Sequence, residues 1–121
     1  MKALSIKQPY ASLIAHNIKN IENRTWKTNF RGKIFIHASA KSAGVPIELL
    51  NQEQLKSLQN GFCELHYPTS AIIGEVDIVD CVINHPSIWA EKSLIEPKKE
   101  NFLYTFSQPN GAETFDGDTY D

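Results

Sequence analysis

The sequence lacks the features of a secreted, membrane-spanning or disulfide-stabilised protein. Cys63 and Cys81 are the only cysteines in 121 residues, too few for a disulfide scaffold and typical of a reducing compartment. No apolar run approaches the ~18 residues of a membrane span. Residues 1–10 have neither the apolar core nor the small-residue cleavage site of a signal peptide. We therefore expect a cytoplasmic monomer with no membrane contact and no cofactor.

Acidic residues are almost missing from the first third of the chain. Residues 1–41 contain eight lysines and arginines but one acid, Glu22, whereas residues 42–121 contain four basic and thirteen acidic side chains. This asymmetry has two interpretations. The first third could build a basic surface that attracts phosphate, or the two regions could neutralise each other across the fold.

The hydrophobic pattern predicts a mixture of strands and helices. Strands are expected at residues 3–6, 21–26, 33–38, 71–83 and 102–107, and helices at 9–18 and 46–58. Asn17 or Asn20 is expected to close the first helix in a left-handed conformation, and Gly74 to mark a bulge or a close backbone approach. Two helices are too few for a doubly wound sheet. The prediction is an α+β fold, a small β-barrel of five to six strands with two or more helices packed outside.

The C-terminal residues differ in composition from the rest of the chain. Residues 110–121 contain four acids and no base, so we expect a folded domain over residues 1–109 and a flexible acidic tail over residues 110–121. Such a tail could bind a protein partner. A protein-interaction domain is therefore one functional hypothesis.

Lys19, Glu22 and Arg24 form a group of charges directly after the first predicted helix. If the segment that follows is extended, Glu22 and Arg24 lie on one face together with Trp26. Lys19 joins them only if the turn after Asn17 directs it inward. A guanidinium fork and a carboxylate suit a planar polar ligand or a phosphate. The alternative is an ordinary surface salt bridge, which contributes about 0–1 kcal/mol.

The chain resembles the ASCH domain family, whose fold is related to the PUA RNA-binding domain, in several segments that follow the family's order. They are "LSIKQPYA", the lysine–glutamate–arginine spacing, "RGKIFIHASAK", "IIGEVDIVDC" and "YTFSQP". The resemblance covers residues 3–109. It implies a PUA-like barrel with a cleft between barrel and helices that binds RNA, a nucleotide or a modified nucleoside.

The same resemblance implies which residues line that cleft. Lys19, Glu22 and Arg24 match the family's motif, and the residues placed near it are Ser5, Lys7, Gln8, Tyr10, His37, Ser39 and Lys41. A binding module for RNA or a nucleotide is therefore the leading hypothesis.

A small amidohydrolase acting on a modified pyrimidine nucleoside is the alternative. Some small family members hydrolyse the acetyl amide of N4-acetylcytidine with a lysine, a threonine and a glutamate. Lys19 matches the lysine, whereas Glu22 stands at the threonine position. In this hypothesis Lys19 is the base, provided that burial lowers its pKa, and Glu22 or Glu75 is the acid partner.

Two Cys-His pairs resemble the spacing of zinc ligands. Cys63 precedes His66, and Cys81 precedes His85. Cys81, however, ends a strongly apolar segment, where a buried thiol is common. We therefore expect no metal site.

His37 and the aromatic residues have both functional and structural interpretations. His37 either donates to a ligand or is a core histidine bonded to the backbone. Tyr10, Trp26, Trp89 and Tyr104 either stack on bases or fill the core. Tyr10 and Trp26 are the candidates for stacking because both flank the charged motif.

Overall fold

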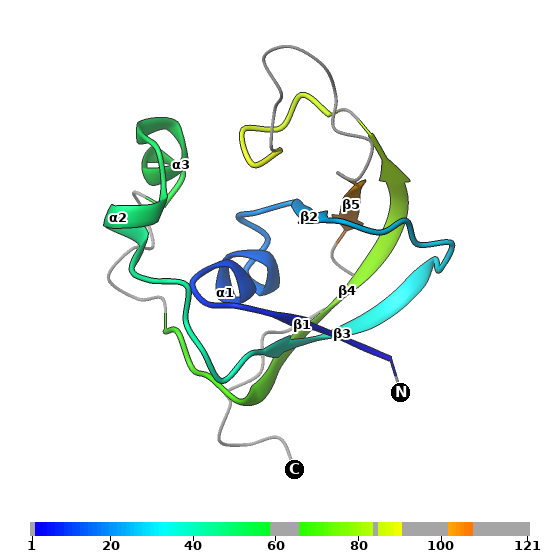
Figure 1. Ribbon diagram of the computed structural model, residues 1–121, viewed down its shortest axis with the longest axis horizontal. Coiled ribbons are helices and arrows are strands. Elements are labelled where there is room, and N and C mark those ends of the chain that lie inside the picture. Colours follow the sequence, from blue (N-terminus) through cyan, green and yellow to red (C-terminus); the bar gives the residue numbers. More distant parts are fainter. Residues whose placement is uncertain (1, 59–65, 84, 91–101, 108–121) are drawn as a thin grey trace.

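The computed structural model describes residues 2–58, 66–83, 85–90 and 102–107. The elements are β1 (Ala3–Ile6), α1 (Tyr10–Ala15), β2 (Ile21–Arg24), β3 (Gly32–Ala38), α2 (Pro46–Leu49), α3 (Gln52–Lys56), β4 (Ala71–Val82) and β5 (Phe102–Ser107). The strands form one mixed sheet in the order β1-β3-β4-β5-β2, in which β1 and β3 are parallel and the other pairs antiparallel (Figure 1). The predicted α+β class is confirmed.

The sheet curves but does not close into the predicted barrel. Its edges are β1 and β2, and each has only four residues with which to form a ladder. The curvature comes from β4, whose first part pairs with β3 and whose later part pairs with β5. A register shift between Ile78 and Asp80 bends this long strand. The two edges therefore come to lie opposite each other without a backbone ladder between them in the described part of the chain.

Helix α1 packs inside the curve of the sheet (Figure 1). Ile14 and Ala15 are buried in the same hydrophobic cluster as Ile36 and Val76. Gly74 allows this close packing, because a Cβ atom there would lie 2.9 Å from the Ala15 Cβ atom. The close approach predicted at Gly74 is confirmed, and it holds the end of α1 against β4.

The single helix predicted over residues 46–58 is wrong, because the chain forms α2 and α3 with an extended link between them. Leu50 and Asn51 have extended backbone angles. The Asn51 side chain accepts a hydrogen bond from the Gln54 backbone, and the Gln54 side chain accepts one from the Asn51 backbone. This capping box starts a new helix, which the apolar spacing alone does not reveal.

Some expectations concern residues outside the described ranges. The acidic tail at residues 110–121 and Cys63 both lie there. Within the described ranges, no helix combines the length and apolar character that crossing a membrane requires.

We expect Gly74→Ala to lower the free energy of unfolding by about 1–3 kcal/mol, because its methyl group would overlap that of Ala15. Chemical denaturation followed by circular dichroism measures this loss. Ala15→Gly removes the opposing methyl group, so the double variant should lose less stability than the two single losses combined. Strict additivity would contradict the close packing of α1 on β4.

Candidate functional site

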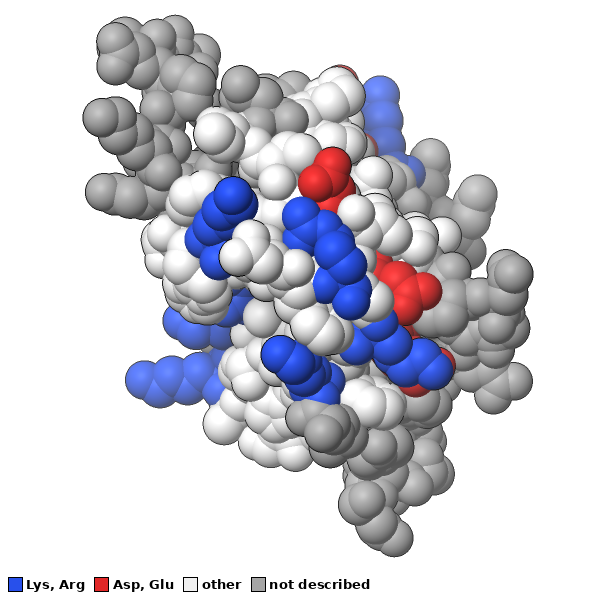
Figure 2. Space-filling view, turned by 90° about the vertical axis from the view of Figure 1, so that its right-hand side faces the viewer, with Lys and Arg blue, Asp and Glu red and all other residues white. Residues whose placement is uncertain are grey.

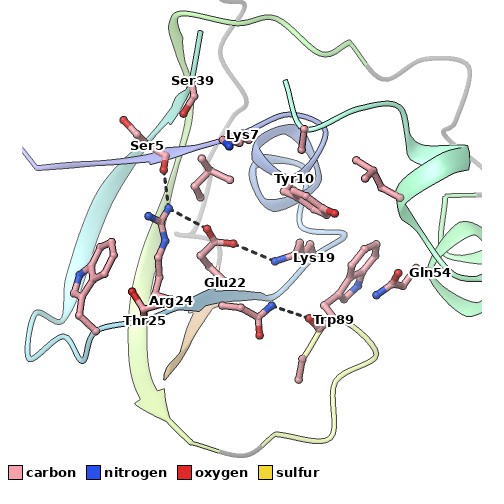
Figure 3. A pocket seen from close by; sticks show the side chains of 16 residues that line it. Ser5, Lys7, Tyr10, Lys19, Glu22, Arg24, Thr25, Ser39, Gln54 and Trp89 are labelled. Atoms are coloured by element: carbon pink, nitrogen blue, oxygen red, sulfur yellow. Dashed lines mark hydrogen bonds and ion pairs between the residues drawn. The ribbon is translucent and has the colours of Figure 1, made fainter. Parts of the chain in front are cut away.

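A pocket of about 610 Å³ opens at the gap between the two edge strands. β1 contributes Ser5 and Ile6 to its lining, and β2 contributes three consecutive residues, Glu22 to Arg24. Tyr10 from the start of α1 and Trp89 from the segment before residue 91 line another part of the pocket (Figure 3). The open sheet thus creates the site, because a continuous ladder between β1 and β2 would close it.

Lys19 enters the pocket because the chain turns sharply after α1. Asn17 takes the left-handed conformation predicted for it, with φ at 61°. The backbone N–H groups of Ile18 and Lys19 then both donate to the Leu13 carbonyl, each at 2.9 Å. This turn ends the helix at Ala15, earlier than predicted, and directs the Lys19 side chain inward until only 4% of its surface is exposed.

Glu22 lies between two cations. Its Oε1 atom is 3.3 Å from Lys19 Nζ, and its Oε2 atom is 2.9 Å from Arg24 Nη2 (Figure 3). Lys19 Nζ also donates to the Ile21 carbonyl. The predicted shared face of Glu22 and Arg24 is confirmed, and Lys19 joins them from the turn. We call these three residues the charged trio.

Arg24 links the two edges of the sheet. Its Nη2 atom donates to the backbone carbonyl of Ser5 on β1 at 2.6 Å, in addition to its bond with Glu22. Its Nε atom is buried without a hydrogen-bond partner among the described residues. A side chain therefore spans the gap that the backbone ladder leaves open, and it forms one wall of the pocket.

Burial changes the pKa values of two groups beside Glu22. Loss of water lowers the pKa of Lys19, and Arg24 lowers it further, whereas Glu22 acts in the opposite direction. Burial raises the pKa of Tyr10, and the negative charge of Glu22 adds to this effect. Tyr10 is therefore a neutral hydroxyl at physiological pH, and the protonated form of Lys19 carries a desolvation cost.

Aromatic rings stand on both sides of the charged trio. The Tyr10 ring centroid is 5.6 Å from Lys19 Nζ, and the Trp26 ring centroid is 5.4 Å from Arg24 Cζ. Trp26 is 55% exposed, whereas Trp89 is buried on the Lys19 side of the pocket (Figure 3). Trp89 was not a leading candidate from the sequence, because it is far from Lys19, Glu22 and Arg24 along the chain and its segment has no periodic pattern.

Asn23 and Gln54 also line the pocket, although neither was among the predicted site residues. Asn23 donates through Nδ2 to the Trp89 carbonyl at 3.1 Å, and Gln54 donates through Nε2 to the Ile88 carbonyl at 2.9 Å. Both bonds hold the segment that carries Trp89. Ser39 and Lys7, which the family resemblance placed near the cleft, also line the pocket.

Four residues predicted for the site lie outside its lining. Gln8 is buried and bonded to Ser12 and to the backbone of Pro68. The His37 ring contacts the Ser5 hydroxyl at 3.0 Å, and Lys41 is exposed. Glu75 lies on β4 with its carboxylate 3.7 Å from Lys33 Nζ. The structure therefore does not bring Glu75 into the pocket beside Lys19.

The described residues contain no group of three or more metal-ligating side chains. Cys81 is half-buried and packs against the main hydrophobic cluster. His85 accepts a hydrogen bond from the Ser87 backbone. Both residues therefore have structural contacts where they lie.

Comparisons with known proteins identify a family. The ASCH domain profile matches residues 4–113 of this chain. Activating signal cointegrator 1 of Homo sapiens is 38% identical over 82 residues, which cover 65% of this chain and 14% of that protein. The Mus musculus protein of the same name is 37% identical over 82 residues, with the same coverage. The chain thus matches only a small part of the length of these curated relatives.

Lys19→Met tests the cost of burying the Lys19 ammonium group. The pKa of Lys19 is lower in the folded protein than its ordinary value of 10.5. Below the folded pKa, the protonated ammonium group therefore lowers the free energy of unfolding. This loss of stability disappears as the pH rises toward 10.5. Glu22 keeps its partner Arg24 in the variant. We therefore expect Lys19→Met to be at least as stable as the wild type at pH 7.

Urea denaturation of both proteins between pH 7 and pH 10 measures this difference. Any stability advantage of Lys19→Met should shrink as the pH rises. A loss of more than about 2 kcal/mol in Lys19→Met at pH 7 would contradict this account, because it would show that the ammonium group stabilises the fold.

Proposed function

Because the chain belongs to the ASCH domain family, we propose that it binds RNA or a nucleotide and takes one base into the pocket beside Lys19, Glu22 and Arg24. The observation that carries this proposal is the charged trio itself. A carboxylate and two cations, each at most 17% exposed, face one pocket from two adjoining segments. Such a buried group is weak evidence for stability, whereas perturbed charges in a cleft are typical of functional sites.

The size and the walls of the pocket support a base as the ligand. Its volume of about 610 Å³ falls within the ~300–1,000 Å³ typical of small-molecule sites. Tyr10, Trp26 and Trp89 give the walls aromatic surface, on which a base can stack with a contribution of about 1–3 kcal/mol. The charged trio supplies hydrogen bonds for the polar edge of the base.

Exposed cations outside the pocket support a polynucleotide. Several lysine and arginine side chains lie on the face shown in Figure 2, with acidic side chains between them. Lys27, which follows the pocket residue Trp26, is exposed, and so is Lys7 at the pocket lining. Arg31 and Lys33 are exposed too, although Asp80 and Glu75 lie within 3.5 and 3.7 Å of them. Phosphates of a bound strand could contact these cations outside the pocket.

Hydrolysis of a modified pyrimidine nucleoside such as N4-acetylcytidine remains the second candidate, and the lowered pKa of Lys19 favours it. A lysine base needs such a shift to be neutral at physiological pH. The carboxylate within reach of Lys19 among the described residues is that of Glu22, which Arg24 also holds. Glu75 is paired with Lys33 instead. Binding without turnover is therefore the function that we favour.

Binding of short single-stranded RNAs and of nucleosides, including N4-acetylcytidine, tests this proposal. We expect Glu22→Gln to weaken binding at least tenfold, because a charge-assisted hydrogen bond contributes about 1.5–3 kcal/mol. Glu75→Gln is the matched control, since it makes the same change in a carboxylate that is paired with Lys33 outside the pocket. Glu75→Gln should leave binding unchanged. The affinity of the wild-type protein for RNA should fall as the salt concentration rises.

Three results would overturn the proposal. Equal binding by wild type and Glu22→Gln would exclude the charged trio as the site. Release of acetate from N4-acetylcytidine, lost in Lys19→Ala, would establish the hydrolase. Binding of a protein partner that requires residues 110–121, without any RNA or nucleoside binding, would establish an interaction domain.

A further inference from the structure

We propose that the charged trio selects guanine. This inference rests on the proposed function, because it assumes that a base enters the pocket with its polar edge toward Glu22. The reason lies in which hydrogen-bonding positions of Lys19, Glu22 and Arg24 are still free after their contacts with one another.

Glu22 keeps about one free acceptor position on each carboxylate oxygen. A carboxylate has about four acceptor sites on its two oxygens. Among the described residues, Lys19 occupies one site on Oε1 and Arg24 occupies one on Oε2. Glu22 also lines the pocket. Two adjacent acceptors are therefore available to a ligand with two adjacent N–H groups.

Lys19 and Arg24 differ in what they can still donate next to these oxygens. An ammonium group has three N–H bonds, and the contacts of Lys19 with Ile21 and Glu22 use two of them. The Nη2 atom of Arg24, which contacts Glu22, has two N–H bonds, and its contacts with Ser5 and Glu22 use both. The other three N–H bonds of the guanidinium are on Nε and Nη1, and Nε is buried without a partner among the described residues. We take the positions that a ligand meets at Glu22 to be, from the Lys19 side, one donor of Lys19 followed by the two acceptors of the carboxylate.

Guanine is the base whose Watson–Crick edge complements this order. It presents the O6 acceptor, the N1–H donor and the N2–H₂ donor in sequence, so O6 can accept from Lys19 while N1–H and N2–H₂ donate to the two oxygens of Glu22. A paired contact of this kind gives both affinity and orientation. Each polar atom of the guanine edge then has a partner.

The other bases leave part of this arrangement unpaired. Uracil presents one N–H between two carbonyl oxygens, so one of its oxygens would face the carboxylate of Glu22. Cytosine has one exocyclic donor beside two acceptors, and adenine has one exocyclic donor beside one acceptor. Each therefore satisfies at most one oxygen of Glu22. A buried polar group that remains unpaired lowers affinity strongly.

The negative charge of Glu22 also argues for a base rather than a phosphate at this point of the pocket. A phosphate placed against both oxygens of Glu22 would be repelled by a like charge. The exposed Lys7 lies in the same lining and could take the phosphate of a nucleotide whose base contacts Glu22. Tyr10 beside Lys19 and Trp26 beside Arg24 provide surfaces for the purine ring.

Calorimetric titration of wild-type protein with the 5′-monophosphates of guanosine, inosine, adenosine, cytidine and uridine tests the inference. A second series uses RNA pentamers in which four uridines flank one central nucleotide. That central nucleotide is guanosine, inosine, adenosine, cytidine or uridine in turn. Guanosine should bind tightest in both series. Inosine lacks only the 2-amino group, so it should bind about tenfold more weakly, and the other three bases about a hundredfold more weakly. Glu22→Gln should remove the preference, with circular dichroism confirming that the variant is folded.

The possible failures separate the two proposals. If all bases bind equally and Glu22→Gln weakens them all alike, the pocket binds nucleotides and the guanine inference is wrong. The same holds if inosine binds as tightly as guanosine, or if a pyrimidine binds tightest. If no monophosphate and no RNA binds, the proposed function fails together with this inference.

Discussion

The position of Glu22 between Lys19 and Arg24 is the interaction on which the site depends. The turn after α1 brings Lys19 to this carboxylate, and β2 brings Glu22 and Arg24. Arg24 then reaches across to the Ser5 carbonyl on β1. Moving charges out of water is costly, and their mutual attraction often only offsets this cost. We therefore propose that ligand binding, and not stability, accounts for the group. Arg24 joins the fold to the site, because it bridges the sheet edges and lines the pocket.

The open sheet and the pocket have a common physical origin. β1 and β2 are short edge strands that the curvature of β4 brings opposite each other. Their backbone groups do not form a ladder among the described residues, so a side chain spans the gap and leaves a pocket beside it. α1 fills the rest of the concave side with apolar residues, and the contact of Ala15 with Gly74 holds it there. The buried ammonium group of Lys19 thereby lies at the gap between the strands and outside this apolar cluster.

The sequence predicted the parts of the structure that local patterns determine. Alternating apolar residues placed the strands, and the matching parity of Glu22 and Arg24 predicted their pairing. Asn17 provided the turn that directs Lys19 inward. The contributions of Trp89, Asn23 and Gln54 could not be predicted, because they depend on contacts between distant segments, such as the bond from Asn23 to the Trp89 carbonyl. Glu75 was only a possible acid partner, because spacing could not show whether its face of β4 meets the cleft or solvent, and its carboxylate lies beside Lys33.

A crystal structure of the protein bound to guanosine monophosphate tests the central claim most directly. The account predicts the base edge within hydrogen-bonding distance of the Glu22 carboxylate, with the contacts of Glu22 to Lys19 and Arg24 intact. A nucleotide bound elsewhere on the molecule, or a charged trio whose side chains point apart into solvent, would contradict it.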